Sequence, residues 1–228
     1  FLTPPCRDLL LGIADHSPFL WRAITRAPDR LVALLEQPPD AASRGIIAQQ
    51  RAVGGDCGTN PDLAAVSRRL RENREAHALL VALADLGGAW DLAAVTQALS
   101  DFADASVSAA TEALLRQGMA AGRFRPPDPA APQDGSGLIV LGLGKLGGGE
   151  LNYSSDIDLV VFYEAEPAAA AAGGDPKAFF VKLAQGLVKL LADRTADGYV
   201  HRIDYRLRPD PGSTAVALST VFAFDYYQ

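Results

Sequence analysis

Two aspartates spaced by one residue, Asp156 and Asp158, stand at the start of an apolar run that ends at Tyr163. Residues two apart in a β-strand project from the same face, so these carboxylates are expected side by side. Like charges held so close are costly unless a cation lies between them. Carboxylate oxygens are ligands that Mg²⁺ prefers. The pair therefore indicates a metal site.

A glycine-rich segment, residues 142–149, lies shortly before the aspartates. Glycine allows a turn whose backbone N–H groups approach phosphate oxygens. The letters GLGKLG match the glycine spacing of a dinucleotide-binding loop, but that loop needs a crossover of about a dozen residues or more before the next parallel strand. Residues 148–155 leave room for a short helical turn at most, and Leu146 stands where a Walker A loop needs Ser or Thr. Metal-assisted nucleotide chemistry is the remaining interpretation.

A strand, a glycine-rich turn and a second strand opening with Asp-x-Asp resemble the nucleotidyltransferase superfamily typified by DNA polymerase beta. That pattern also has a third carboxylate on a later strand. The matching positions here are Gly144, Asp156, Asp158 and Asp204. Lys145 departs from the small residue that is usual after the glycine, and it offers a cation to the phosphates.

Two longer blocks narrow the resemblance: GLGKLGGGELNYSSDIDLVVFY at residues 142–163 and RIDYRLRPDPGSTAVALST at residues 202–220. They are similar to the signature blocks of the glutamine synthetase adenylyltransferase family of bacteria. Its members carry two such domains, one attaching AMP to a tyrosine of glutamine synthetase and the other removing it by phosphorolysis. The letters RLRPDPGST resemble the N-terminal, adenylyl-removing half. The helical first part of the chain, with DHSPFL at 15–20 and RRLR at 68–71, resembles the region before the first domain.

The resemblance implies a site, a cofactor and partners. Two Mg²⁺ ions, or Mn²⁺ in their place, would be held by Asp156, Asp158 and Asp204. Nucleotide or phosphate would contact Gly144, Lys145, Ser155 and Arg206. The implied reaction is removal of AMP from adenylylated glutamine synthetase by phosphate, giving ADP and the tyrosyl enzyme, in nitrogen regulation in the bacterial cytoplasm. The implied partners are glutamine synthetase and, for the full-length enzyme, the nitrogen regulatory PII protein.

Three other functions stay open: ATP-dependent adenylylation by the same family, a non-enzymatic fragment that binds glutamine synthetase, and another transferase of the superfamily. Structural roles also stay open for single residues. Asp156 can cap a turn, Asp204 can pair with Arg202 or Arg206, Lys145 can be solvated, and Ser155 can bond its own backbone. Arg206 and Arg208 can bind phosphate or brace the acidic site, and bracing is the favoured role. The arginines of 68–74 are expected on a solvated helix face, and the histidines are expected to pack or lie at the surface.

The helices and strands that position these residues are predicted from the spacing of apolar residues and from proline, glycine and helix-capping residues. We predict an α+β fold, with a helical domain over 1–124, a proline-rich linker over 125–137 and a nucleotidyltransferase domain over 138–228 whose mixed sheet is flanked by helices. Asp62 and Asp91 are expected to cap two helices, with a further helical segment over 107–119. The second domain is expected to have strands over 138–143, 158–163 and 199–207, a loop over 165–174 and a helix over 176–196.

Composition bounds the class of protein. The chain has 228 residues and a net charge of −6, which disfavours binding along a nucleic-acid backbone. No apolar stretch approaches the roughly 20 residues that span a bilayer. The two cysteines, Cys6 and Cys57, lack metal-site spacing and are expected to be reduced thiols of a cytoplasmic protein. Because the chain begins with Phe and ends in what reads as the start of a helix, we expect it to be part of a longer protein, truncated at its C-terminus.

Overall fold

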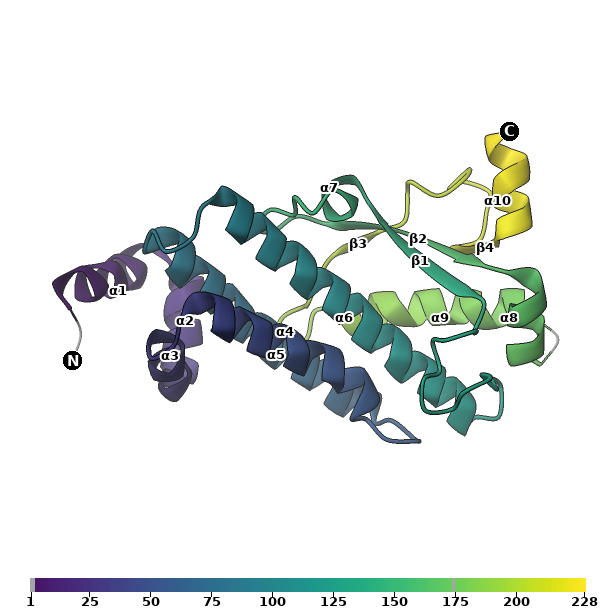
Figure 1. The fold of residues 1–228 in the computed structure, drawn as a ribbon, viewed down its shortest axis with the longest axis horizontal. Coiled ribbons are helices and arrows are strands. Elements are labelled where there is room, and N and C mark those ends of the chain that lie inside the picture. The colour runs from purple at the N-terminus through teal and green to yellow at the C-terminus, as the bar shows by residue number, and fades with distance from the viewer. Residues whose placement is uncertain (1–2, 174) are drawn as a thin grey trace.

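The computed structural model describes residues 3–173 and 175–228, in which helices predominate (Figure 1). The helices before the sheet are α1 (Pro4–His16), α2 (Pro18–Arg26), α3 (Pro28–Leu35), α4 (Pro39–Gly55), α5 (Leu63–Leu86) and α6 (Leu92–Ala120). The later helices are α7 (Gly144–Gly147), α8 (Ala165–Ala171), α9 (Pro176–Leu191) and α10 (Thr220–Tyr227). The strands are β1 (Leu138–Leu143), β2 (Ile157–Tyr163), β3 (Ile203–Asp204) and β4 (Ala217–Ser219).

Local signals explain where the long helices begin. The carboxylates of Asp62 and Asp91 accept hydrogen bonds from the amides of Ala64 and Ala94, both at 2.9 Å, and so cap α5 and α6 as predicted. Proline occupies the first turn of α9, where its missing N–H costs nothing. Among the described residues, no helix has both the length and the apolar character needed to cross a membrane.

The sheet is mixed, with β2 at its centre. β1 runs antiparallel to β2, whereas β3 and β4 run parallel to it and pair with successive parts of its other edge. The antiparallel pairing of β1 and β2 excludes a dinucleotide-binding βαβ unit, in which consecutive strands are parallel. The structure is thus the predicted α+β fold, with a small mixed sheet and flanking helices.

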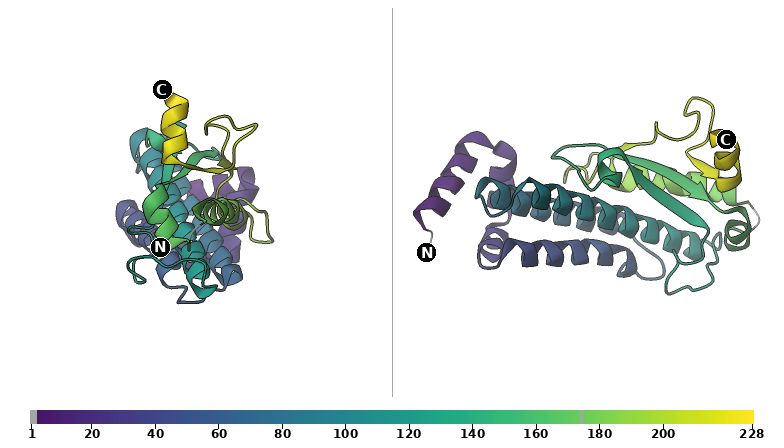
Figure 2. Two further views of the ribbon diagram at one scale, coloured as in Figure 1. Left: turned by 90° about the vertical axis from the view of Figure 1, so that its right-hand side faces the viewer. Right: turned by 45° about the horizontal axis from the view of Figure 1, so that its top comes forward.

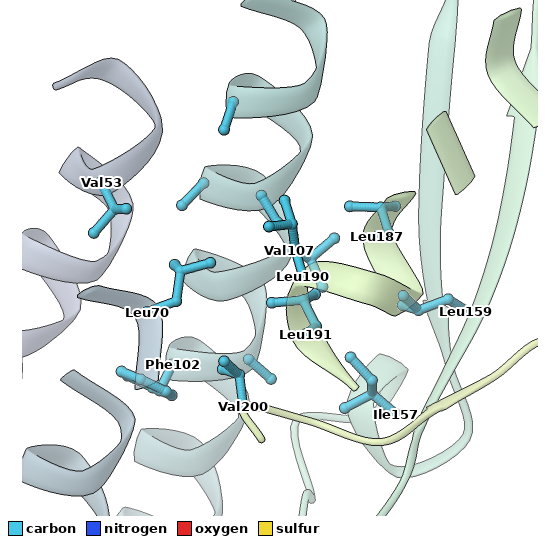
Figure 3. Close-up of a cluster of buried hydrophobic side chains, with 14 of the residues drawn as sticks. Val53, Leu70, Phe102, Val107, Ile157, Leu159, Leu187, Leu190, Leu191 and Val200 are labelled. Atoms are coloured by element: carbon cyan, nitrogen blue, oxygen red, sulfur yellow. The ribbon is translucent and has the colours of Figure 1, made fainter. Parts of the chain in front are cut away.

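The helices and the sheet share one hydrophobic core. The long helices α4, α5 and α6 run side by side, with α9 and the sheet packed over them and with α1 and α10 at opposite ends (Figures 1 and 2). Leu70 of α5 and Phe102 of α6 belong to the same buried cluster as Leu191 of α9 and Ile157 of β2 (Figure 3). Residues 125–137 form neither helix nor strand, and one buried cluster joins the residues before them to the residues after them. The division into two domains therefore stays a prediction.

Four local predictions differ from the structure. The helix predicted over 176–196 ends at Leu191. The segment 107–119 is the second half of α6 and not a separate helix. The alanine-rich segment 165–171 forms α8, in keeping with the high helix propensity of alanine. The third strand is only Ile203–Asp204, because residues 199–201 pack on the long helices and the chain turns at residue 205. The apparent alternation over 199–207 therefore reflected separate contacts of a mostly irregular segment.

Candidate active site

The sheet brings two of the predicted acidic residues together. Asp158 of β2 is paired in register with Asp204 of β3, and on its other side it faces Leu143 of β1. The next residue along β1 is Gly144, which begins α7. The parallel β2–β3 pair and the antiparallel β1–β2 pair thus place Asp158 between the second acid and the glycine-rich turn.

Gly144 lies very close to the carboxylate of Asp158. Its φ of +55° is a left-handed conformation, and a Cβ built at this position would lie 2.6 Å from Asp158 Oδ2. Both the backbone angle and the contact therefore require glycine. The amides of Gly148, Gly149 and Glu150 donate to carbonyls of the same turn, so the N–H groups left for a phosphate are those at the start of α7.

Arg206 binds Asp204 with both its backbone and its side chain. The Arg206 amide donates to Oδ1 of Asp204 at 2.8 Å, and Nε donates to Oδ2 at 2.7 Å. These bonds hold the pKa of Asp204 below its usual range, so the carboxylate stays ionised at neutral pH. Arg206 itself is largely exposed, in keeping with the predicted bracing role and with a side chain that can reach solvent.

Arg202, 46 residues away in the sequence, forms an ion pair with Asp156. Its Nε donates to Asp156 Oδ1 and its Nη2 donates to the carbonyl of Ser154. The Arg202 carbonyl in turn accepts from the amide of Ile157 at 2.9 Å. The open alternative of an Arg202–Asp204 pair is not what forms, because the two pairs Arg202–Asp156 and Arg206–Asp204 divide the arginines.

The acids do not converge as a preformed metal cage. Within 3–173 and 175–228, no three side chains of His, Cys, Asp or Glu are grouped closely enough to hold a metal ion. In the same part of the chain Asp158 forms no ion pair, whereas the other two acids hold arginines. An all-carboxylate donor set on adjacent strands suits Mg²⁺ or Mn²⁺ chemically. The two-metal site held by Asp156, Asp158 and Asp204 therefore stays a prediction.

The remaining predicted residues lie around this cluster. Lys145 is exposed on α7, directly after Gly144. Ser155 donates its amide to the Asn152 carbonyl at 3.2 Å, the contact of a turn residue. Arg208 donates to the carbonyls of Tyr205 and Pro211 and so braces the loop that follows β3.

The long helices contact the loop before Asp156, and the sequence did not predict these contacts. Ser100 of α6 accepts from the Leu151 amide at 3.1 Å, and Tyr153 donates its hydroxyl to Asp85 of α5 at 3.0 Å. Burial and this bond raise the pKa of Tyr153. Nothing in the local sequence signals these partners, which are distant along the chain.

A small cavity of about 50 Å³ lies behind the same loop. Its lining includes Arg74, His77, Tyr199 and His201, together with residues 152–155. Burial lowers the pKa of both histidines to about 3, so both are neutral. His77 stacks on Phe102, which confirms the predicted packing role. A larger groove of about 870 Å³, between the ends of α6 and α9, lies away from the acids.

Comparison with known proteins places this arrangement in one family. Residues 8–228 match the family model described as glutamate-ammonia ligase adenylyltransferase. The chain is 52% identical over 225 residues to a protein of Xanthobacter autotrophicus and 49% identical over 222 residues to one of Bradyrhizobium diazoefficiens. Both relatives are named bifunctional glutamine synthetase adenylyltransferase/adenylyl-removing enzyme. The matches cover 99% and 97% of the chain, which spans 22% of the length of each relative.

Proposed function

This chain belongs to the glutamate-ammonia ligase adenylyltransferase family, and on that basis we propose that it removes AMP from adenylylated glutamine synthetase. The observation that supports nucleotidyl transfer is the pairing of Asp158 with Asp204 across β2 and β3, with Gly144 directly against Asp158. This geometry joins two carboxylates to a glycine turn, as nucleotidyl transfer requires. The direction, removal of AMP, rests on the resemblance of RLRPDPGST at residues 206–214 to the adenylyl-removing half.

The proposed reaction is a phosphorolysis. An oxygen of inorganic phosphate attacks the phosphorus of the AMP group, and the bond from phosphorus to the tyrosine oxygen breaks. The proton of the attacking hydrogen phosphate ends on the tyrosine oxygen, so the products are ADP and unmodified tyrosine. Bound Mg²⁺ supplies charge neutralisation at the phosphoryl oxygens.

The residues of the chain have separate roles in this proposal. Asp156, Asp158 and Asp204 would hold the cations. Arg206 and Lys145, both exposed, bind phosphate oxygens. The amides at the start of α7 meet the nucleotide phosphate. Glutamine synthetase is the proposed protein substrate, the PII protein is the proposed regulator of the full-length enzyme, and the cytoplasm is the proposed location.

The direction of the reaction is tested with modified and unmodified glutamine synthetase. Incubation of the chain with the AMP-modified protein, Mg²⁺ and phosphate is expected to give ADP. Asp158→Asn and Asp204→Asn should each lower that rate by about a thousandfold or more, since both remove charge stabilisation at the transferred group. The exposed Asp134→Asn is the matched control and should have no effect. AMP transfer from ATP to the unmodified protein, with no ADP formed from phosphate, would assign the adenylylating activity instead.

A further inference from the structure

Arg71 of α5 is buried, although its surroundings in the sequence predict a solvated helix face. Only 2% of the residue is exposed. Its Nε donates to the Gly198 carbonyl at 2.8 Å, and its Nη2 donates to the Asp193 carbonyl at 2.6 Å. Its Nη1 donates at 3.0 Å to the carbonyls of Leu190 and Ser67. A guanidinium with this many partners is fully engaged in one place.

Apart from the Ser67 carbonyl of its own helix, the carbonyls that Arg71 binds belong to the end of α9 and the turn after it. The last carbonyls of a helix lack intrahelical partners and form the negative end of its dipole. A cation at Leu190 and Asp193 therefore stabilises the end of α9. Gly198 closes the turn with a φ of +84° and a backbone bridge to Thr195. Arg71 of α5, which is far from this segment in the sequence, thus fixes the conformation of residues 190–198.

Two other arginines of the helical region hold the same turn. Arg74, one helical turn beyond Arg71, lies between the rings of Phe19 and Tyr199, at 5.5 and 5.9 Å from the ring centroids. Its Nε also approaches the Val200 carbonyl at 3.4 Å. Arg26 of α2 binds Asp197 at 2.5 Å. The turn is therefore held by side chains from α2 and α5.

This turn leads directly to the acidic site. The amides of Val200 and His201 donate to the Leu191 carbonyl, and the next residue, Arg202, holds Asp156. Two residues later Asp204 pairs in register with Asp158. The span from Val200 to Asp204 is too short to absorb a shift of the turn without moving the acid.

We propose that Arg71 is a positioning residue of the active site, which sets the place of Arg202 and Asp204 by fixing the turn after α9. Arginine suits this role because its rigid fork reaches carbonyls in several directions at once, which the single ammonium of lysine does not. The effect on turnover rests on the proposed function, whereas the effect on the backbone does not.

Hydrogen exchange tests the backbone effect on the chain without substrate. In Arg71→Lys, the amides of residues 157 and 199–204 should exchange about tenfold faster than in the chain without substitutions, because the turn loses its hydrogen bonds to the guanidinium. Peptides from α4 and from the middle of α6 should be unchanged. Ser67→Ala, which removes one side-chain acceptor of Arg71 but keeps the buried cation, is a milder second variant that guards against misfolding of the first. It should show a smaller change in the same peptides.

Turnover tests the consequence for the site. A misplacement of about 1 Å can cost roughly a hundredfold in rate, so Arg71→Lys should lower kcat by about tenfold to a hundredfold with little change in KM. The concentration of Mg²⁺ that gives half the maximal rate should also rise. Arg68→Lys is the matched control, since Arg68 is exposed on the same helix.

The outcomes separate the proposal from its premise. Unchanged exchange at 199–204 in both variants, or equal loosening of every peptide, would overturn the positioning role. Exchange that changes as expected while kcat and the Mg²⁺ dependence do not would also overturn it. If the unmodified chain forms no ADP at all, the proposed function fails, and the exchange experiment still decides whether Arg71 sets the segment that carries Asp204.

Discussion

At the scale of single residues, the acidic site is balanced by arginines. Asp156 and Asp204 each accept a guanidinium, and Asp158 lies against the backbone of Gly144. Neighbouring carboxylates repel one another, so these pairings stabilise the site in the absence of a cation. Both arginines of the pairs are mostly exposed, which makes exchange of partners easy.

Gly144→Ala is the residue-scale test of this arrangement. The alanine would have to adopt the left-handed backbone conformation of Gly144. Its Cβ would lie 2.6 Å from Asp158 Oδ2, so the carboxylate must move. We expect a loss of about 1–2 kcal/mol in the free energy of unfolding from the backbone strain. We also expect at least a tenfold loss of ADP formation, because Asp158 is displaced.

The control for this change is Gly148→Ala in the same turn. Gly148 has a φ of −85°, and its nearest contact for a new Cβ is 3.6 Å away. In urea unfolding and phosphorolysis assays, the stability and the rate of ADP formation of Gly148→Ala should be close to those of the chain without substitutions. Equal effects of the two substitutions would show that the turn tolerates no side chain at all, and the specific contact with Asp158 would lose its support.

At the scale of elements, the close approach of α4 and α6 supports the rest of the molecule. Gly54 near the end of α4 is buried against α6, where a Cβ would lie 2.5 Å from the Ala109 carbonyl. α6 in turn packs on α9, and it supplies Ser100 to the loop before Asp156. The spacing of two helices outside the sheet thus reaches the site through α6.

Gly54→Ala and Gly45→Ala form a matched pair in α4. Gly54→Ala must separate α4 from α6 and is expected to lower the free energy of unfolding by about 1–3 kcal/mol. Gly45 has no atom within 4 Å of a new Cβ, so Gly45→Ala should raise stability by about 0.5–1 kcal/mol through helix propensity. Urea denaturation measures both. A Gly54→Ala variant that is as stable as Gly45→Ala would contradict the close packing.

At the scale of the whole molecule, buried neutral histidines join the helical region to the segment before β3. His77 of α5 stacks on Phe102 of α6 at 4.3 Å, and the ring of His201 lies 5.9 Å from that of Phe102. Burial is the first cause of their low pKa, and the nearby Arg74 is the second. Protonation of either ring would place a charge in this shared core.

These histidines predict a loss of stability in acid. The pKa of about 3 in the folded chain lies below the ordinary value of 6.5, so between these values the unfolded chain binds more protons than the folded one. Stability from this source is complete above pH 6.5 and falls as the pH is lowered, by about 1.4 kcal/mol per pH unit for each histidine. Urea unfolding at pH 7, 6 and 5 measures the slope.

His77→Phe keeps the stacking on Phe102 and removes one titrating group. The dependence of unfolding free energy on pH should become shallower by about the share of one histidine. His16→Phe makes the same substitution at an exposed histidine on α1 and is the matched control. An unchanged slope in His77→Phe would show that the pKa of this ring in the folded chain is close to its ordinary value.

Local patterns determined much of the protein. Caps at Asp62 and Asp91, the proline in the first turn of α9 and the apolar run of β2 act within a few residues, so the sequence alone predicted those elements. The same holds for the glycine turn and Asp156-x-Asp158, whose spacing on one chain segment indicates their chemistry. The fold class followed from these short signals, and the family resemblance followed from the longer blocks at residues 142–163 and 202–220.

Only the tertiary structure decided the partners. Arg202 lies 46 residues from Asp156, and Arg71 lies 127 residues from Gly198, so neither pairing is visible in a local pattern. Arg71 and Arg69 are both arginines of one helix, yet the first is buried and the second pairs with Asp56 at the surface. The reason is physical: a long polar side chain is buried only where packing brings unpaired carbonyls to it, and here the end of α9 supplies them.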